Sequence, residues 1–135
     1  DGFIRAIPKA ELHLHIEGTL EPELKFALAE RNGLELPYAS VEQMRAAYDF
    51  DDLPSFLAQY YEGMSVLQRE PDFYDLAMAY FGRVAEQGLV YVELFFDPQA
   101  HTSRGVEFET VIDDFYRQMV ETIAADPSTD PPTAA

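Results

Sequence analysis

The sequence predicts an α/β fold in which strands alternate with helices. Residues 10–16 alternate between polar and apolar side chains, which is typical of a strand with one buried face. Residues 89–96 (Leu-Val-Tyr-Val-Glu-Leu-Phe-Phe) are nearly all apolar, as in a parallel strand that is covered on both faces. Amphipathic helical patterns lie between and after these segments. The order of strand, helices, strand and helix is that of an α/β protein.

The first predicted strand carries two of the chain's three histidines on one face. Two residues apart on a strand, side chains point the same way. The alternation therefore separates two sets: Leu12, Leu14 and Ile16 on one face, and Glu11, His13 and His15 on the other. Gly18 ends the strand.

Local start and stop signals predict the next two helices. One begins near Pro22, because proline suits the first helical position, and stops at Gly33. Ser40 and Gln43 have the spacing of a capping box, which predicts a short helix to about residue 48.

Three further helical segments and a tail complete the chain. Pro54 opens a helix with a wide aromatic face, and Asp72 is the expected N-cap of a longer helix that Gly88 ends. A last helix is expected at about 107–125. Residues 126–135 contain three prolines and no large apolar side chain, so we expect a disordered tail there.

Composition excludes several classes of function. The 135 residues include 9 basic and 25 acidic side chains, a net charge of −16, and no cysteine. Disulfides, thiolate metal sites and a cysteine nucleophile are therefore excluded. Strong acidity argues against nucleic acids or anionic membranes as partners. No apolar run reaches the roughly 18 residues of a membrane span, and no secretory signal is visible, so we expect a soluble cytoplasmic protein.

His13 and His15 are the candidate metal ligands. Their Cα atoms should lie roughly 6–7 Å apart, so both imidazoles can reach one ion at about 2.0–2.1 Å. Neutral imidazole suits Zn²⁺, with Fe, Co or Mn as alternatives. Two such histidines can equally be half-exposed, or hydrogen-bonded in a core. A catalytic zinc ion typically takes three protein ligands and a water molecule, and the sequence offers no convincing third ligand.

Residues 8–19 (Pro-Lys-Ala-Glu-Leu-His-Leu-His-Ile-Glu-Gly-Thr) resemble the first strand of the adenosine/adenine deaminase family. The His-Ile-Glu-Gly form is closer to the adenine branch than the His-Leu-Asp-Gly form typical of adenosine deaminases. Residues 90–93 (Val-Tyr-Val-Glu), residues 95–102 (Phe-Phe-Asp-Pro-Gln-Ala-His-Thr) and Arg104-Gly105 are similar to the second strand and following loop of that branch. The resemblance covers about residues 7–120.

The resemblance implies a (β/α)8 TIM barrel that binds one zinc ion. Residues 1–125 would be the N-terminal part of that barrel, with helices inserted after the first strand, and His13 and His15 would be zinc ligands. The family's third histidine ligand and its general-acid glutamate would lie beyond residue 135. Because a full barrel takes about 250 residues, we expect this chain to be incomplete and inactive by itself. Its unclosed strand edge would be open to association.

The implied reaction is the hydrolysis of adenine, a small purine, to hypoxanthine and ammonia. The zinc ion activates a water molecule, and a glutamate carries the proton to the ring and the leaving group. Two alternatives remain: an adenosine deaminase, or a catalytically inactive fragment or pseudo-enzyme that binds metal or a partner chain.

Three residues are candidate substrate contacts. Glu17 matches the family's acidic position after the two histidines, where it would contact the substrate or tune a neighbouring group; the alternative is a solvated carboxylate at a strand end. The longer glutamate leaves less room than aspartate, which fits a free base better than a nucleoside. Phe56 and Tyr60 lie on the helix that forms an apolar roof over the family's pocket, but aromatic residues four apart on a helix are more often plain core.

Three polar residues at or after the second strand complete the candidates. Glu93 lies in an apolar run, so we expect a buried, hydrogen-bonded carboxylate with a structural role. Asp97 and His101 follow that strand and belong either to a substrate loop or to an ordinary polar loop. The resemblance places the third zinc ligand on a later strand, so His101 is not proposed as that ligand.

Overall fold

The computed structural model describes residues 2–113 and 117. Within these residues, two parallel strands pair, β1 (Lys9–His15) and β2 (Leu89–Phe95). The other elements are α1 (Gly2–Ala6), the 3-10 turn η1 (Ile16–Thr19), α2 (Pro22–Asn32), α3 (Val41–Ala46), α4 (Leu53–Met64), α5 (Glu70–Gln87) and α6 (Pro98–Thr102). Residues 108–113 are also helical. Residues 114–116 and 118–125 of the helix predicted at 107–125 lie outside the described residues. The whole tail predicted at 126–135 also lies outside them.

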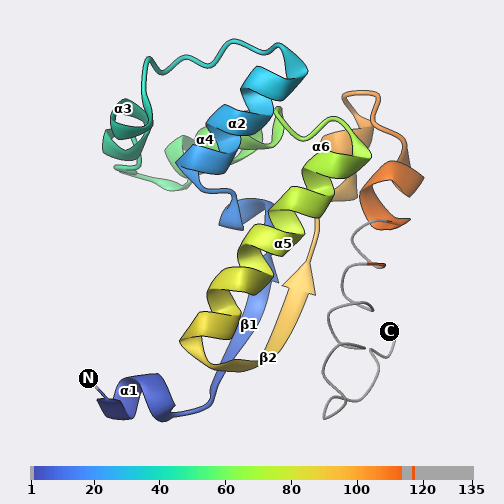
Figure 1. Ribbon diagram of the computed structural model, residues 1–135. Coiled ribbons are helices and arrows are strands. Elements are labelled where there is room, and N and C mark those ends of the chain that lie inside the picture. The colour runs from blue at the N-terminus through green and yellow to red at the C-terminus, as the bar shows by residue number, and fades with distance from the viewer. Residues whose placement is uncertain (1, 114–116, 118–135) are drawn as a thin grey trace.

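The helices gather at one end of the two strands (Figure 1). In this view α5 runs across the sheet, while α2, α3, α4 and α6 lie beyond the carboxyl ends of β1 and β2 and α1 lies at the opposite end. In α/β barrels the chemistry is built at the carboxyl ends of the strands. The end that holds most of the helices is therefore the end where candidate residues belong. No helix among the described residues has the length and apolar character needed to span a membrane.

Glycine stops end α2 and α5 where the sequence predicts. Gly33 (φ 65°) and Gly88 (φ 72°) are both left-handed C-caps. This conformation costs little only for glycine. A Cβ at residue 88 would also come within 3.4 Å of the Arg5 carbonyl oxygen, so this turn admits no larger residue without strain. The predicted N-cap Ser40 is confirmed, since its side chain accepts a hydrogen bond from the Gln43 backbone N–H.

The start of α5 differs from the prediction. The helix begins at Glu70 with Arg69 as N-cap, and Asp72 is the third helical position rather than the cap. From there the Asp72 carboxylate accepts the backbone N–H groups of Gln68 (3.0 Å) and Arg69 (2.9 Å). Asp72 therefore caps the helix from inside its first turn, a role that residue preference alone does not distinguish from the N-cap.

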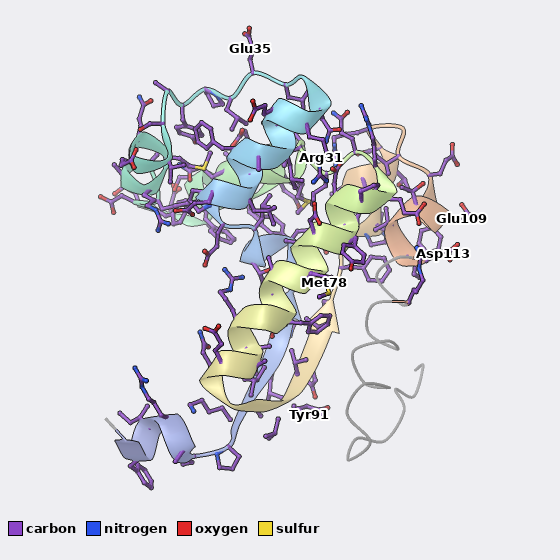
Figure 2. All side chains as sticks on the ribbon, in the orientation of Figure 1. Arg31, Glu35, Met78, Tyr91, Glu109 and Asp113 are labelled. Carbon is purple, nitrogen blue, oxygen red and sulfur yellow. The ribbon has the colours of Figure 1, made fainter. Side chains whose placement is uncertain are left out.

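One face of the sheet is covered and the other is not. Leu14, Val92 and Leu94 pack against a buried cluster that includes Phe73, Leu76 and Tyr80 of α5. On the opposite face Tyr91 (labelled in Figure 2), Glu93 and Phe95 are exposed. The prediction of a buried Glu93 is therefore wrong: its carboxylate is exposed and accepts the Tyr91 hydroxyl at 3.2 Å. The apolar run 89–96 predicts a strand that is covered on both faces, whereas in the structure α5 covers only one face.

Asp72 is expected to be a main determinant of stability. Its side chain is fully buried and also accepts hydrogen bonds from Arg31 (3.1 Å; labelled in Figure 2) and Asn32 (2.8 Å). Asp72→Ala leaves these donors without their acceptor and should lower the free energy of unfolding by about 3 kcal/mol or more in urea denaturation. The matched control is Asp75→Ala, which removes the other carboxylate on Arg31 (2.5 Å, 32% exposed) and should cost about 1 kcal/mol or less. Equal effects of the two variants would contradict this account.

Candidate functional site

The two histidines of β1 lie together at the carboxyl end of the sheet. Their ring centroids are 5.5 Å apart. Both rings stack on Phe95 of β2, at 4.6 Å for His13 and 5.6 Å for His15. Parallel pairing places His15 opposite Phe95, which explains this shared support. Two imidazoles that converge on one side of a strand end are a suitable pair of donors for one metal ion.

A bulge in β1, rather than a regular alternation, brings these rings together. The pairing register shifts between Glu11 and Leu14, and His13 adopts a left-handed φ of 57°. Leu12 is consequently 62% exposed instead of sharing the buried face of Leu14, so that part of the prediction is wrong. Bulges recur beside active sites, where they re-aim a side chain. A left-handed non-glycine residue costs about 1–3 kcal/mol, and such strain clusters at functional sites.

Asp97, two residues past the end of β2, contacts His15 through the ring nitrogen Nδ1. Its Oδ1 lies 3.2 Å from His15 Nδ1, and its Oδ2 accepts the Tyr60 hydroxyl at 2.7 Å. Burial, together with this hydrogen bond, raises the pKa of Tyr60 above its usual value, so the phenol remains a donor at neutral pH. A carboxylate accepts from Nδ1 only when Nδ1 carries the proton. This arrangement leaves the Nε2 lone pair of His15 free for a metal ion.

Glu17 is buried rather than solvated. The 3-10 turn η1 ends the alternation of β1 and buries both Ile16 and Glu17, the latter to 4% exposure. Oε1 of Glu17 accepts the Asp97 backbone N–H (2.8 Å) and lies 3.0 Å from His101 Nε2. Oε2 is buried without a hydrogen-bond partner. Because an unpaired buried polar atom costs about 1–3 kcal/mol, a ligand that donates to Oε2 would be stabilised.

A small pocket adjoins this carboxylate. Its volume is about 220 Å³. Its lining comprises Glu17, Gly18, Leu20, Lys25, Tyr48, Phe50, Phe56, Gln59, Tyr60 and Gly63. The structure thus brings all three predicted substrate residues to one pocket. The Phe56 and Tyr60 rings stack at 5.8 Å, and the buried Lys25 is paired with Glu62. Sites for drug-sized ligands measure about 300–1,000 Å³, so this pocket suits one smaller, flat molecule.

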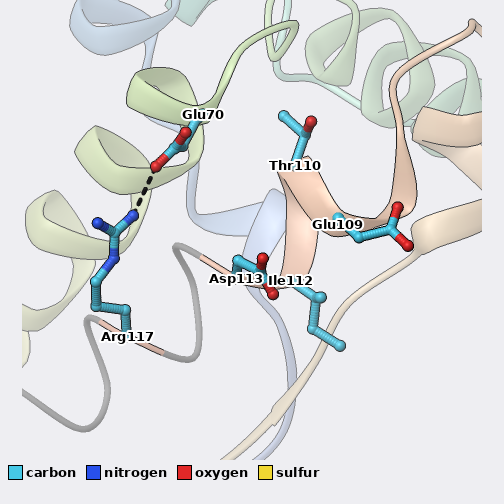
Figure 3. Close-up of a pocket in the computed structure, with 6 residues that line it drawn as sticks. All are labelled: Glu70, Glu109, Thr110, Ile112, Asp113 and Arg117. Carbon is cyan, nitrogen blue, oxygen red and sulfur yellow. Dashed lines mark hydrogen bonds and ion pairs between the residues drawn. The ribbon is translucent and has the colours of Figure 1, made fainter.

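A larger hollow lies elsewhere on the surface (Figure 3). It measures about 700 Å³ and is lined by Glu70, Glu109, Thr110, Ile112, Asp113 and Arg117. Arg117 donates to Glu70 at 2.6 Å, an exposed ion pair. None of the predicted site residues lines this hollow. It offers three carboxylates and one guanidinium, and we assign no role to it.

Asp97 and His101 have roles that the sequence does not reveal. Both were candidates only for a loop, yet Asp97 contacts His15 and His101 of α6 is fully buried against Glu17. The signal available was their position after β2, because parallel strands bring their carboxyl ends to one edge. Within residues 2–113 and 117, no group of three or more histidine or carboxylate side chains is arranged to hold a metal ion.

Comparison with known proteins gives one consistent family. A family model described as adenosine deaminase matches residues 8–126. An adenine deaminase from Rhodospirillum rubrum is 66% identical over 110 residues, which are 82% of this chain and 33% of the relative. One from Caulobacter vibrioides is 59% identical over 119 residues, 88% of this chain and 35% of the relative. The chain thus spans about a third of the length of the curated relatives it matches.

Solved structures agree with the fold. The crystal structure of an adenine deaminase from Arthrobacter aurescens matches with a TM-score of 0.85 and 54% identity, over 89% of this chain and 37% of that one. Arabidopsis ADAL complexed with IMP matches with a TM-score of 0.64 and 17% identity, over 87% and 35%, a likeness of fold alone. Both are TIM-barrel enzymes, so the expected barrel fold is confirmed, and the β1–β2 unit corresponds to part of such a barrel.

Proposed function

The chain belongs to the adenosine deaminase family, and from this premise we propose that it forms part of a zinc-dependent enzyme that hydrolyses adenine to hypoxanthine and ammonia. The observation that carries the proposal is that Oε2 of Glu17 is buried without a hydrogen-bond partner beside a pocket of about 220 Å³. A single residue forms hydrogen bonds with both Glu17 and His15. That residue is Asp97, which binds Glu17 through its backbone and His15 through its carboxylate.

His13 and His15 would hold the zinc ion. They fit it in ligand type, in convergence at the carboxyl end of β1, and in the free Nε2 of His15. When bound, zinc lowers the pKa of a coordinated water molecule to about 7, so hydroxide is available at neutral pH. The residues described here bind and orient: Asp97 fixes the His15 ring, and Tyr60 fixes Asp97.

The pocket beside Glu17 fits a free base better than a nucleoside. A carboxylate oxygen accepts hydrogen bonds, so a ligand that donates to Oε2 would satisfy it. The imidazole N–H of adenine and the ribose hydroxyls of adenosine are both such donors, so it is the space beside Glu17 and not its charge that separates the two substrates. The stacked rings of Phe56 and Tyr60 supply an apolar wall for a flat heterocycle. The size of the pocket also favours the smaller substrate.

Activity is proposed for the complete barrel, meaning residues 8–126 joined to the matching remainder of an adenine deaminase such as the Rhodospirillum rubrum relative. Ammonia release from adenine and from adenosine should be measured on this complete barrel and on the 135-residue chain. We expect turnover of adenine by the complete barrel, much slower turnover of adenosine, and none by the shorter chain. Preference for adenosine would support an adenosine deaminase instead. Absence of both activities in a folded, zinc-loaded barrel would support a pseudo-enzyme.

Loss of Asp97 is expected to weaken metal binding. Partners that hold a metal-ligating histidine typically contribute 10–100-fold to metal affinity. We therefore expect Asp97→Ala to lower the zinc affinity of the complete barrel about 10–100-fold in competition with a chelator. The control is Glu93→Ala, which removes an exposed carboxylate four positions earlier and should leave zinc affinity unchanged. An Asp97→Ala protein with wild-type affinity would contradict the assigned role.

We further propose that the uncovered face and edges of the sheet make the 135-residue chain self-associate. On the uncovered face Tyr91 is 54% exposed, and elsewhere on the two strands Val90 is 71% and Leu12 62% exposed. Strand edges readily pair with other chains. Sedimentation of the 135-residue chain should show oligomers that Val90→Lys reduces. A monodisperse monomer that melts cooperatively would contradict this expectation.

A further inference from the structure

We propose that His101 is a positioning residue for substrate binding: held in one tautomer by Arg104, it donates to Oε1 of Glu17 and so fixes the orientation of the Glu17 carboxylate, whose Oε2 stays unpaired beside the pocket. The identity of the ligand as a purine base rests on the proposed function. The positioning itself rests on hydrogen bonds among buried and half-buried side chains that contact neither His13 nor His15.

The contacts on its two ring nitrogens fix the tautomer of His101. Nη2 of Arg104 lies 2.9 Å from His101 Nδ1. A guanidinium group donates and never accepts, so Nδ1 must be the acceptor and carries no proton. The ring proton is then on Nε2, which lies 3.0 Å from Oε1 of Glu17 and donates to it. In the opposite tautomer, the Nδ1–H of His101 would point at an N–H group of Arg104, and the lone pair of Nε2 would face the Glu17 carboxylate.

Arg104 is itself firmly held. It donates to the backbone carbonyl oxygens of Met64 (2.9 Å), Ser65 (3.2 Å) and Leu67 (3.3 Å). These carbonyls lie where α4 ends, so the guanidinium position is set by the backbone there. The ring of His101 is fully buried and meets Phe73 edge-on at a centroid distance of 4.9 Å. Since the ring is enclosed in this way, its direction is fixed before any ligand arrives.

This arrangement gives the two oxygens of Glu17 different roles. Oε1 receives both protein donors, His101 Nε2–H and the Asp97 backbone N–H, while Oε2 receives none. Two donors on one oxygen determine how the carboxylate plane lies, so the other oxygen is presented in a fixed direction. Without His101, one donor remains and the carboxylate can turn. Pre-organised acceptors bind more tightly because less ordering is lost on binding.

Kinetics of two variants in the complete barrel test the proposal. His101→Leu removes the donor while keeping an apolar side chain of similar bulk, and His101→Gln retains an N–H donor at the end of the side chain. We expect His101→Leu to raise KM for adenine about tenfold or more, with kcat much less affected and zinc content unchanged. His101→Gln should recover most of the loss. A purely structural role would lower folded yield and would not separate Gln from Leu.

Nitrogen NMR of the 135-residue chain tests the tautomer without any activity. Two-bond ¹H–¹⁵N spectra at neutral pH should show His101 protonated at Nε2 and bare at Nδ1. The proposal is overturned if Nδ1 carries the proton, if both nitrogens do, or if His101→Leu has the wild-type KM. If the wild-type barrel deaminates no purine, the proposed function fails. The NMR spectra still decide the positioning role, because they should show the Nε2–H tautomer of His101 in the wild-type chain and its loss in Arg104→Met.

Discussion

Replacing His15 with alanine in the complete barrel is expected to abolish zinc binding and ammonia release together. With one imidazole gone, the remaining donors hold the ion weakly, and the hydroxide source is lost. Because a metal ion contributes several kcal/mol to such a reaction, turnover of adenine should fall by about 10³-fold or more. His13→Ala should behave in the same way. Metal content per chain by mass spectrometry and ammonia release by a coupled assay measure the two effects.

The chain provides a matched comparison within its own histidines. It contains three, and His101 is turned toward Glu17 and Arg104 rather than toward His13 and His15. His101→Leu should therefore keep its zinc, whereas His13→Ala and His15→Ala should lose it. If His15→Ala retained zinc and turnover, or if all three variants lost zinc alike, the assignment of the two ligands would be untenable.

Glu17→Gln is expected to have the second largest effect. The amide keeps the size of the side chain but removes the charge that strengthens its hydrogen bonds, and it cannot accept at both ends. Charge-assisted hydrogen bonds contribute about 1.5–3 kcal/mol, so kcat/KM for adenine should fall about 10–100-fold, while zinc content stays the same.

A suitable control for this variant is Glu21→Gln. Glu21 lies four residues further on, is exposed and pairs with Arg83, so its loss should change kcat/KM for adenine less than about threefold. Steady-state kinetics on both variants decide the matter. Wild-type kinetics for Glu17→Gln would show that its unpaired oxygen does not bind the substrate.

Local signals account for most of the elements that were predicted correctly. The strands at β1 and β2, the proline at the start of α2, and the glycines after α2 and α5 are read from a few neighbouring residues each. The bulge at His13 is different in kind, because it arises from the pairing register between β1 and β2, and the 73 residues 16–88 separate these two strands in sequence. Periodicity within one segment carries no information on such a shift.

The residues of the site also differ in whether the sequence alone identifies them. His13, His15 and Glu17 stand within five residues, so a motif suffices to single them out. Their partners do not: Glu17 meets His101 across 84 positions and His15 meets Asp97 across 82. Only the parallel pairing of two strands brings these groups to one edge. The misjudged burial of Glu93 has a similar origin, since an apolar run does not state which of its faces a helix covers.

Anomalous scattering at the zinc absorption edge, measured on crystals of the complete barrel, tests the central claim most directly. The account predicts one strong peak at about 2.0–2.1 Å from a ring nitrogen of both His13 and His15, with the His15 nitrogen being Nε2. A zinc ion bound elsewhere, or a well-occupied barrel crystal with no peak between these two imidazoles, would contradict it.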